Sequence, residues 1–217
     1  GEFIGYAEDS FTPSEFDLTP YIKAKNNVLA VQVHKMSTAA FLEDQDFFRF
    51  FGIFRNVTLK AIPDVHVQDM WIKPTLNEDN TSGAIRVDVK ISAANVGEKS
   101  AKFILADKSG NKLLCKDIAL EDTAGMVQGS MMAEVEKVIP WDNRSPYLYE
   151  AFIEVYENGQ LAEVVFYRVG FRRLEIIDKV MYLNGKRLIL TGVNRHEWNA
   201  KTGRVIGMDE MISDMKC

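Results

Sequence analysis

The stretch YEAFIEVYENGQLAEVVFYRVGF, residues 149–171, decides the fold of the central part of the chain. Apolar and polar residues alternate on both sides of Asn158-Gly159, and this alternation is typical of strands with one buried face. An Asn-Gly pair between two such runs is the strongest short signal for a tight β-hairpin. This stretch therefore predicts two antiparallel strands joined at Asn158-Gly159.

The residues before this hairpin continue the same pattern. Ile85, Val87, Val89 and Ile91 fall on one face of a predicted strand, and a second hairpin is expected around Ser109-Gly110-Asn111. About seven short strands within roughly 100 residues, with almost no helical pattern, are typical of an immunoglobulin-like sandwich. We therefore predict an immunoglobulin-like β-sandwich over residues 64–173.

The first part of the chain, residues 1–63, also has the pattern of β structure. Leu29, Val31 and Val33 alternate with less apolar residues, which predicts a half-buried strand, and a second alternating run follows at residues 52–62. The residues between these two runs have no clean period and predict a long loop.

The last part, residues 174–217, has a different character. A short hairpin around Asn184-Gly185 precedes the nearly continuous apolar run Leu188–Val193, which fits a strand buried on both faces of a parallel sheet. A helical pattern follows, with Asp209 as its expected N-cap. Strand, loop and helix together form the first unit of an α/β fold.

Composition excludes several classes of protein. The chain has 217 residues and a net charge of −5, and it contains no basic tract that would indicate nucleic-acid binding. Its apolar runs are all shorter than the roughly 18 residues of a membrane helix. The two cysteines are too few for a disulfide framework, and Cys115 is expected to be a buried thiol. Because the sequence opens within strand-like residues and closes within a helical pattern, we expect it to be a segment of a longer protein.

The first candidate site is NRHEW, residues 194–198, directly after the predicted buried strand. In an α/β barrel, loops at this end of the strands converge around the active site. His196 can donate a hydrogen bond in either protonation state, which suits a polar substrate. The alternative is that these polar residues only complete a loop at the rim of a barrel.

The second candidate site is FLEDQDFFRFFGIFRNV, residues 41–57. Carboxylates at Glu43, Asp44 and Asp46 stand beside phenylalanines, and carboxylate oxygens suit a hard cation. A carboxylate beside aromatic faces also fits sugar recognition. The alternative is a salt-bridged loop in which Arg49 and Arg55 neutralise the acids.

Six stretches together resemble glycoside hydrolase family 2, and most closely its large bacterial β-galactosidases. They stand in the family's order and are GYAEDSFTPSEFDLTPYI, FLEDQDFFRFFGIFRNV, WDNRSPYLY, VGFRRLEI, LNGKRLILTGVNRHEW and MDEMISDMK. The resemblance covers essentially the whole chain. It is tight in the first 60 and last 50 or so residues and looser between them.

The resemblance implies a mainly β chain of three parts. Residues 1–63 would be the C-terminal part of a jelly-roll sugar-binding domain, and residues 64–173 a complete immunoglobulin-like β-sandwich. Residues 174–217 would be the first βα unit of a (β/α)8 barrel. Because a truncated jelly roll exposes strand edges and a lone βα unit cannot bury its sheet face, residues 64–172 are expected to be the stable folding unit, with the flanks frayed, wrongly paired or associated with neighbours.

The resemblance also implies a role for two residues. Asp46 matches a ligand of both a sodium ion and the galactosyl hydroxyls, and His196 matches a residue that stabilises the transition state. The acid/base and nucleophile, the magnesium ligands and the remaining sodium ligands would lie on barrel strands beyond residue 217. Na⁺ and Mg²⁺ are thus expected in the parent enzyme, and neither is expected to bind stably to this chain alone.

The implied activity is that of a retaining β-galactosidase, which hydrolyses terminal non-reducing β-D-galactose residues from lactose-like substrates. The chain alone is expected to be inactive. The alternatives are a non-catalytic carbohydrate-binding or spacer module, or a β-glucuronidase or β-mannosidase of the same family. The parent is expected to be a cytoplasmic homo-oligomer that takes a galactoside and binds neither nucleic acid nor membrane.

Overall fold

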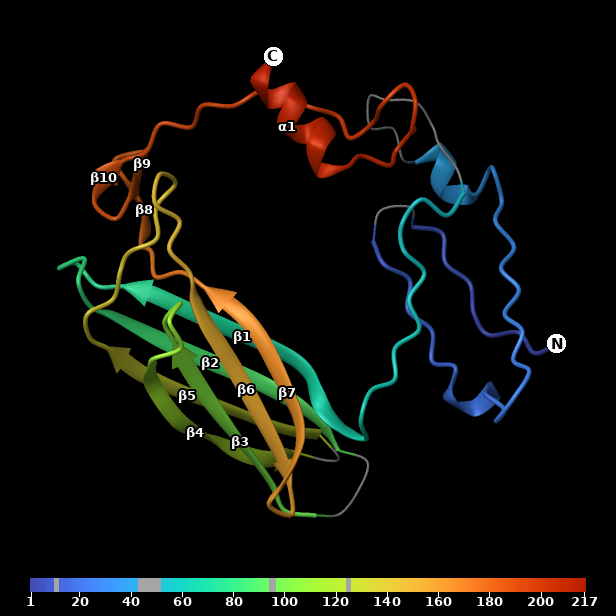
Figure 1. Cartoon of the computed structure of the whole chain (residues 1–217), viewed down its shortest axis with the longest axis horizontal. Helices are drawn as coiled ribbons and strands as arrows, with labels where there is room; N and C mark the ends of the chain where they lie inside the picture. The colour runs from blue at the N-terminus through green and yellow to red at the C-terminus, as the bar shows by residue number, and fades with distance from the viewer. Residues whose placement is uncertain (10–11, 43–51, 94–96, 124–125) are drawn as a thin grey trace. The chain divides into compact units, whose positions relative to one another are not determined.

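The computed structural model describes residues 1–9, 12–42, 52–93, 97–123 and 126–217 (Figure 1). These residues form two compact units. The central unit is Lys60–Thr191, and the flanking unit joins Gly1–Leu59 to Gly192–Cys217.

The central unit is built on a seven-stranded sheet in which every neighbouring pair is antiparallel. The strands follow the order β1-β2-β5-β4-β3-β6-β7. Their bounds are β1 Val65–Leu76, β2 Gly83–Ala93, β3 Lys99–Ala106, β4 Lys112–Thr123, β5 Met126–Val135, β6 Tyr149–Glu157 and β7 Gln160–Val169.

Strand β4 joins two halves of this sheet. Its residues up to Ile118 pair with β3, whereas those from Ala119 onward pair with β5. The backbone amide of Val67 in β1 donates to the carboxylate of Glu163 in β7 at 2.7 Å, so the two outer strands approach each other. The sheet therefore curls over its own core, which confirms the predicted immunoglobulin-like architecture (Figure 1).

The core of the central unit is formed by inward-facing residues of this curled sheet. Ile85, Val87, Val89 and Ile91, the predicted inner face, are at most 3% exposed. Among the described residues, every buried hydrophobic side chain lies between Val65 and Leu183. At about 25 cal/mol per Å² of buried apolar surface, this one core provides most of the hydrophobic stabilisation of the described chain.

The two predicted Asn-Gly hairpins are confirmed by their backbone angles. Asn158 and Gly159 between β6 and β7 have φ of 48° and 77°, and Asn184 and Gly185 have φ of 53° and 77°. Positive φ at both central residues defines the type I′ turn, whose twist matches that of the flanking strands.

A three-stranded sheet follows the sandwich and belongs to the same unit. Its strands are β8 Leu174–Ile177, β9 Val180–Leu183 and β10 Lys186–Arg187, in the order β10-β9-β8. Asn184 ties this sheet to the sandwich, because its side-chain amide donates to the carbonyl of Trp141 at 3.0 Å and accepts from the amide of Arg173 at 2.9 Å.

The flanking unit contains two 3₁₀ turns, η1 Thr19–Tyr21 and η2 Thr38–Phe41, and the helix α1 Met208–Lys216. The described residues of 1–62 form no strand, so the strand predicted around Leu29, Val31 and Val33 is wrong. These side chains are 59%, 59% and 49% exposed. A strand needs a neighbour for its backbone groups and a face to bury, and the described residues provide neither here.

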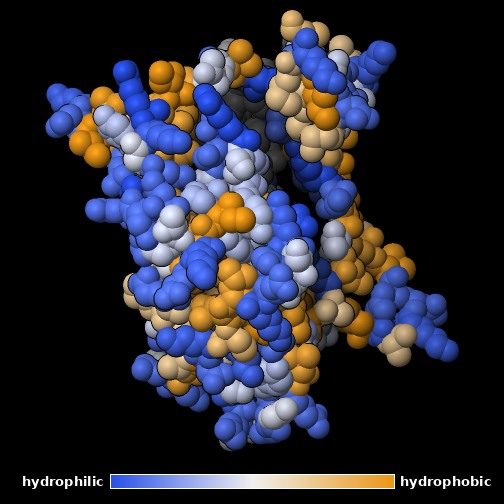
Figure 2. Space-filling view, turned by 60° about the vertical axis from the view of Figure 1, so that its left-hand side comes forward, coloured by the Kyte–Doolittle hydropathy of each residue, from blue (hydrophilic) through white to orange (hydrophobic). Residues whose placement is uncertain are grey.

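The prediction of a doubly buried strand at Leu188–Val193 is also wrong. Ile189, Leu190 and Val193 are 72%, 74% and 88% exposed, and this segment has no strand structure. A barrel strand is held by neighbours on both sides, which the described residues do not contain. Figure 2 shows several apolar patches open on the molecular surface.

Two smaller predictions need correction. Cys115 is exposed, not buried, because it lies an odd number of positions from the inward-facing Ile118 on β4 and so faces outward. The N-cap of α1 is Gly207 rather than Asp209, and the amide of Gly207 donates to the carboxylate of Glu210 at 3.0 Å. Asp209 instead adds negative charge to the first helical turn, where the helix dipole favours it.

No helix in the described parts of the chain has the length and apolar character needed to cross a membrane.

Candidate functional site

Of the two predicted site residues, the structure places only His196. Asp46 lies outside the described residues, together with Glu43, Asp44 and Arg49. The structure describes the residues just downstream of the acidic cluster, beginning with Gly52. They share the flanking unit with the loop that carries His196.

His196 lies on an exposed, irregular stretch between Gly192 and Trp198. Its backbone carbonyl accepts a hydrogen bond from the amide of Trp198 at 2.9 Å, which closes a tight local bend. An imidazole can donate to a substrate hydroxyl in either protonation state, and when neutral it can also accept. This is the donor chemistry that a sugar-binding site requires.

Arg195, on one side of His196, is anchored to helix α1. Its Nη2 and Nε both lie 2.8 Å from Oδ2 of Asp214. The side chain of Arg195 is 25% exposed, so the guanidinium is partly shielded from solvent. The contact fixes the loop to the helix that follows it in sequence.

Glu197, on the other side of His196, is bound by a residue distant in the sequence. Its Oε2 lies 3.2 Å from Nη2 of Arg55, and the two residues are 142 positions apart. Nη1 of Arg55 also donates to the carbonyl of Arg204 at 3.1 Å. Arg55, which one interpretation of the sequence assigned to neutralising the acidic cluster, therefore pairs with Glu197 in the described structure.

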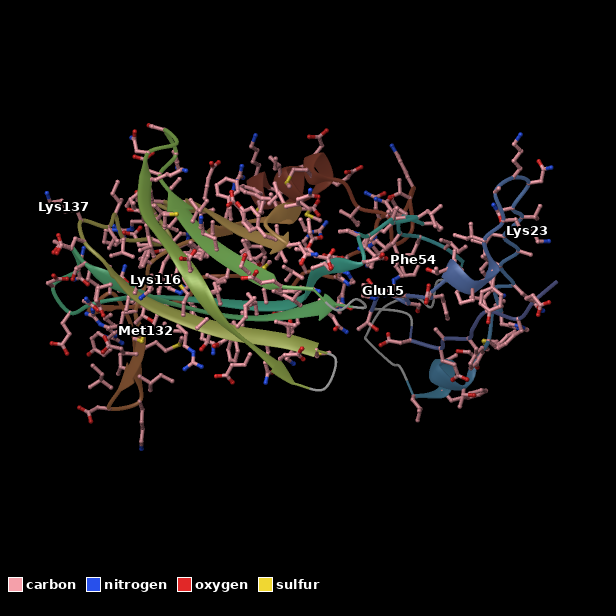
Figure 3. All side chains as sticks on the ribbon, turned by 90° about the horizontal axis from the view of Figure 1, so that it is seen from below. Glu15, Lys23, Phe54, Lys116, Met132 and Lys137 are labelled. Atoms are coloured by element: carbon pink, nitrogen blue, oxygen red, sulfur yellow. The ribbon has the colours of Figure 1, made fainter. Side chains whose placement is uncertain are left out.

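Phe54 lies against two guanidinium groups. The Cζ atom of Arg204 is 4.7 Å from the ring centroid and that of Arg55 is 5.3 Å from it (Figure 3 labels Phe54). Arg204 is only 9% exposed, so its contact with the ring is largely desolvated and stronger than at an open surface.

The loop that presents Arg204 is closed by its own backbone. Asn199 and Gly203 exchange two hydrogen bonds of 2.8 and 2.9 Å, and Gly203 adopts a φ of 64°. Arg204, which contacts the ring of Phe54, directly follows this turn.

The described residues contain no group of three or more His, Cys, Asp or Glu side chains that could hold a metal ion. They therefore do not fit a magnesium site, which needs several oxygen ligands in octahedral geometry. For sodium, the chemistry of Asp46 is suitable, because a carboxylate oxygen is a hard ligand. One such residue leaves most of the coordination to other groups.

Two surface hollows on the central unit involve none of the predicted site residues. They measure about 230 and 310 Å³, at or below the lower end of ligand-pocket sizes. Neither hollow is lined by a predicted site residue. His196, the candidate residue that the structure describes, belongs to the flanking unit.

Sequence reasoning missed Phe54, Glu197 and Arg204 as parts of this arrangement. Phe54 and Glu197 stand in the two motifs that were singled out, but neither motif reveals that it contacts the other. Arg204 had no signal of its own in the sequence. Alternation and spacing report local structure, and these contacts join residues far apart in the chain.

Three family models match the chain. The sugar binding domain of glycosyl hydrolases family 2 matches residues 1–63, the model described as glycosyl hydrolases family 2 matches residues 65–172, and the TIM barrel domain of that family matches residues 174–217.

Curated relatives match along nearly the whole chain. The beta-galactosidase large subunits of Lactobacillus acidophilus and Lactobacillus helveticus are 49% and 50% identical to it, over 99% of this chain and 34% of their own length. The beta-galactosidase of Streptococcus thermophilus is 45% identical over all of this chain and 21% of its own length. The chain thus spans about a third or less of the length of these relatives.

Solved structures share the fold. A beta-glucuronidase of Parabacteroides merdae superposes with a TM-score of 0.68 at 25% identity, covering 79% of this chain and 22% of that one. The beta-glucuronidase of Bifidobacterium dentium, complexed with coumarin-3-O-glucuronide, gives a TM-score of 0.61 at 20% identity, covering 71% and 25%. The second likeness indicates the fold alone.

Proposed function

The chain belongs to glycosyl hydrolases family 2, and on that premise we propose that its 217 residues form part of a retaining β-galactosidase. The whole enzyme would hydrolyse terminal non-reducing β-D-galactose residues from lactose-like substrates. The observation that carries this proposal is the 49–50% identity to beta-galactosidase large subunits across 99% of the chain.

The proposed reaction is a double displacement at the anomeric carbon. Retaining glycosidases use two carboxyl groups about 5 Å apart, one as acid/base and one as nucleophile. In the proposed enzyme both come from barrel strands outside this chain. Glu197, a carboxylate beside His196, is bound by the Arg55 guanidinium, which supports leaving it out of the catalytic pair.

The chain's own contribution is to bind the galactosyl unit. Asp46 would accept hydrogen bonds from its hydroxyls, and His196 would donate one that strengthens as charge develops in the transition state. A sodium ion held by Asp46 would supply a further electrostatic contact to a sugar oxygen. These interactions orient the ring for attack, but they do not break the glycosidic bond.

The chain alone should therefore be inactive, and this is directly testable. The purified 217-residue chain and the full-length parent would each be incubated with a nitrophenyl β-galactoside. We expect turnover only from the parent, because loss of both catalytic carboxyls leaves little above background. Activity of the chain that persists through repurification and scales with its concentration would overturn the expectation.

The similarity to solved beta-glucuronidases favours one alternative, a glucuronidase. Sequence identity supports the galactosidase, at 49–50% against 25%. Charge supports it as well, because the carboxylate of Asp46 would repel a glucuronate and tolerate a neutral galactoside. Assaying the parent with the galactoside, the glucuronide and the mannoside separates the three activities.

The names of two relatives bear on assembly. Both are called large subunits, which supports a parent that pairs with an unlike subunit rather than the homo-oligomer expected from the resemblance. Light scattering and denaturing electrophoresis of the purified parent would distinguish one polypeptide from two.

A further inference from the structure

We propose that Arg55 is a positioning residue that holds the loop carrying His196 against residues 54–55. The inference rests on the proposed function, in which Asp46 and His196 contact the same galactosyl unit. Arg55 lies shortly downstream of Asp46 in sequence, and it touches the loop that contains His196 at two separate points.

The first argument is the geometry of the Arg55 guanidinium. One terminal nitrogen reaches the carboxylate of Glu197 at 3.2 Å, and the other reaches the backbone carbonyl of Arg204 at 3.1 Å. A planar guanidinium with two engaged donors fixes direction as well as distance, which a lysine ammonium does not. Arg55 therefore spans the two ends of the loop between Glu197 and Arg204.

The second argument is the placement of His196 between two anchored neighbours. Arg195 is tied to Asp214 of α1 by contacts of 2.8 Å, and Glu197 is tied to Arg55. Side chains fixed on both sides of one residue restrict the backbone that presents it. Losing the Arg55 contact would therefore remove one of these two anchors beside His196.

The third argument is the ring of Phe54, which precedes Arg55. Arg204, 9% exposed, packs over this ring at 4.7 Å, so the same loop is also held through an aromatic contact. The joint is thus made of one ion pair, one backbone hydrogen bond and one cation–π contact. All three connect residues 54–55 to residues 197–204.

The joint is suited to positioning rather than to stability. The side chains of Arg55 and Glu197 are each 59% exposed, and exposed ion pairs contribute little to folding. A displacement of about 1 Å near a reacting centre can cost on the order of 100-fold in rate. Breaking the pair should therefore impair catalysis much more than folding.

The test uses the full-length parent with Arg55→Gln, Glu197→Gln and the double variant. Each should lower kcat/KM for a nitrophenyl β-galactoside by roughly 10- to 100-fold, mainly through kcat. The double variant should lose no more than the worse single variant, because both substitutions break one contact. Arg55→Lys should recover only part of the loss.

Lys90→Gln is the matched control, since it removes an ion pair to Asp69 whose side chains are also more than half exposed. It should leave kcat/KM unchanged. The melting temperatures of the Arg55→Gln and Lys90→Gln variants should both stay within about 2 °C of the parent. Equal kcat/KM in the Arg55→Gln and Lys90→Gln enzymes would overturn the proposal. It would also be overturned if unfolding accounted for the whole loss of activity in both the Arg55→Gln and the Glu197→Gln variants.

A second measurement separates this proposal from the proposed function. In the 217-residue chain, Arg55→Gln should speed amide hydrogen exchange within residues 192–206, whereas Lys90→Gln should not. An inactive unaltered parent would overturn the galactosidase function and the catalytic role of Arg55 with it. Unchanged exchange would overturn the joint itself, whatever the activity of the parent.

Discussion

At the scale of single residues, Asn184 shows how one buried amide can join loops that are far apart. It is 9% exposed and adopts a φ of 53°, a conformation that asparagine tolerates better than most side chains. Its amide uses both polar atoms, on Trp141 and Arg173. The sequence predicted the turn at Asn184-Gly185, but it did not predict that the Asn184 side chain would be buried and hydrogen-bonded to Trp141 and Arg173.

Asn184→Asp should destabilise the central unit. The change removes the donor to the Trp141 carbonyl and sets a carboxylate oxygen against it, in a buried site. We expect the free energy of unfolding to fall by about 2 kcal/mol or more, measured by urea denaturation of the whole chain.

Asn158→Asp is the control for this change. Asn158 has a similar φ of 48° and also precedes a glycine, but its side chain is exposed and accepts a hydrogen bond from the amide of Glu98. Aspartate can accept that hydrogen bond equally well. A loss of stability as large as that of Asn184→Asp would contradict the assigned role of the buried amide.

Asp79 provides a pH-dependent contribution in the turn between β1 and β2. Its carboxylate accepts four hydrogen bonds, from the amides and hydroxyls of Thr81 and Ser82. Led by the backbone amide of Thr81, these bonds lower the pKa of Asp79 to about 2. A pKa below that of the unfolded chain means that the ionised form stabilises the fold.

The stabilisation by Asp79 should be fully present above its unfolded pKa of about 3.8 and should be lost as the pH falls through about 2. At neutral pH, Asp79→Asn should lower the melting temperature. The gap between the two proteins should close between about pH 4 and pH 2. Glu78→Gln, which changes an adjacent carboxylate outside these four hydrogen bonds, should show no such convergence. A gap that stays constant across this range would contradict the assignment.

At the scale of elements, strand β4 holds the sandwich together by pairing with β3 and then with β5. Gly129 of β5 lies opposite Leu120, just past the point where β4 changes partner. A Cβ atom added at Gly129 would lie 2.3 Å from the carbonyl oxygen of Ala119. Lys116 and Met132 flank the same junction, where Nζ of Lys116 donates to the Met132 carbonyl at 2.8 Å (Figure 3).

Gly129→Ala should therefore push β4 away from β5. We expect a loss of about 1–3 kcal/mol in the free energy of unfolding, as for other overpacked sites, together with faster amide exchange at residues 119–122. Gly192→Ala is the control, because an added Cβ there meets no atom within 4 Å. Equal free energies of unfolding for the two variants would contradict this prediction, because they would show that the backbone of β4 can shift without loss of stability.

The hairpins were predictable because their determinants are local. Asn-Gly at positions 158–159 and 184–185 requires only its own φ angles and the alternation beside it. The apolar run Leu188–Val193 has an equally clear pattern, but a buried strand depends on neighbours that its sequence does not contain. Cys115 was misplaced for another reason, since alternation defines two faces without saying which one is buried.

The site was predictable only in part, for the same physical reason. His196 stands in a motif that the sequence presents directly, whereas the Arg55–Glu197 contact joins residues 142 positions apart. A single sequence carries no signal for such a pair. The roles of Asp46 and His196 stay predictions, because they depend on a sugar and on further residues of the active site.

At the scale of the whole molecule, the last prediction concerns the apolar residues of the Leu188–Val193 segment. Ile189 and Leu190 are 72% and 74% exposed in this chain, and large exposed apolar patches mark surfaces that bind something else. In the proposed parent the same segment would be the first strand of a barrel, buried between neighbouring strands and helices. The double variant Ile189→Thr, Leu190→Ser should thus have different effects in the two proteins.

In the chain alone, the double variant should reduce binding of an apolar dye and leave the melting of the sandwich unchanged. In the parent it should lower the free energy of unfolding by about 3 kcal/mol or more, since two core side chains are truncated. Val164→Thr, at a partly exposed position on β7, should have little effect in either protein. A double variant that changes both proteins alike would contradict a barrel strand at this position, because only a partner supplied by the rest of the enzyme makes the two outcomes differ.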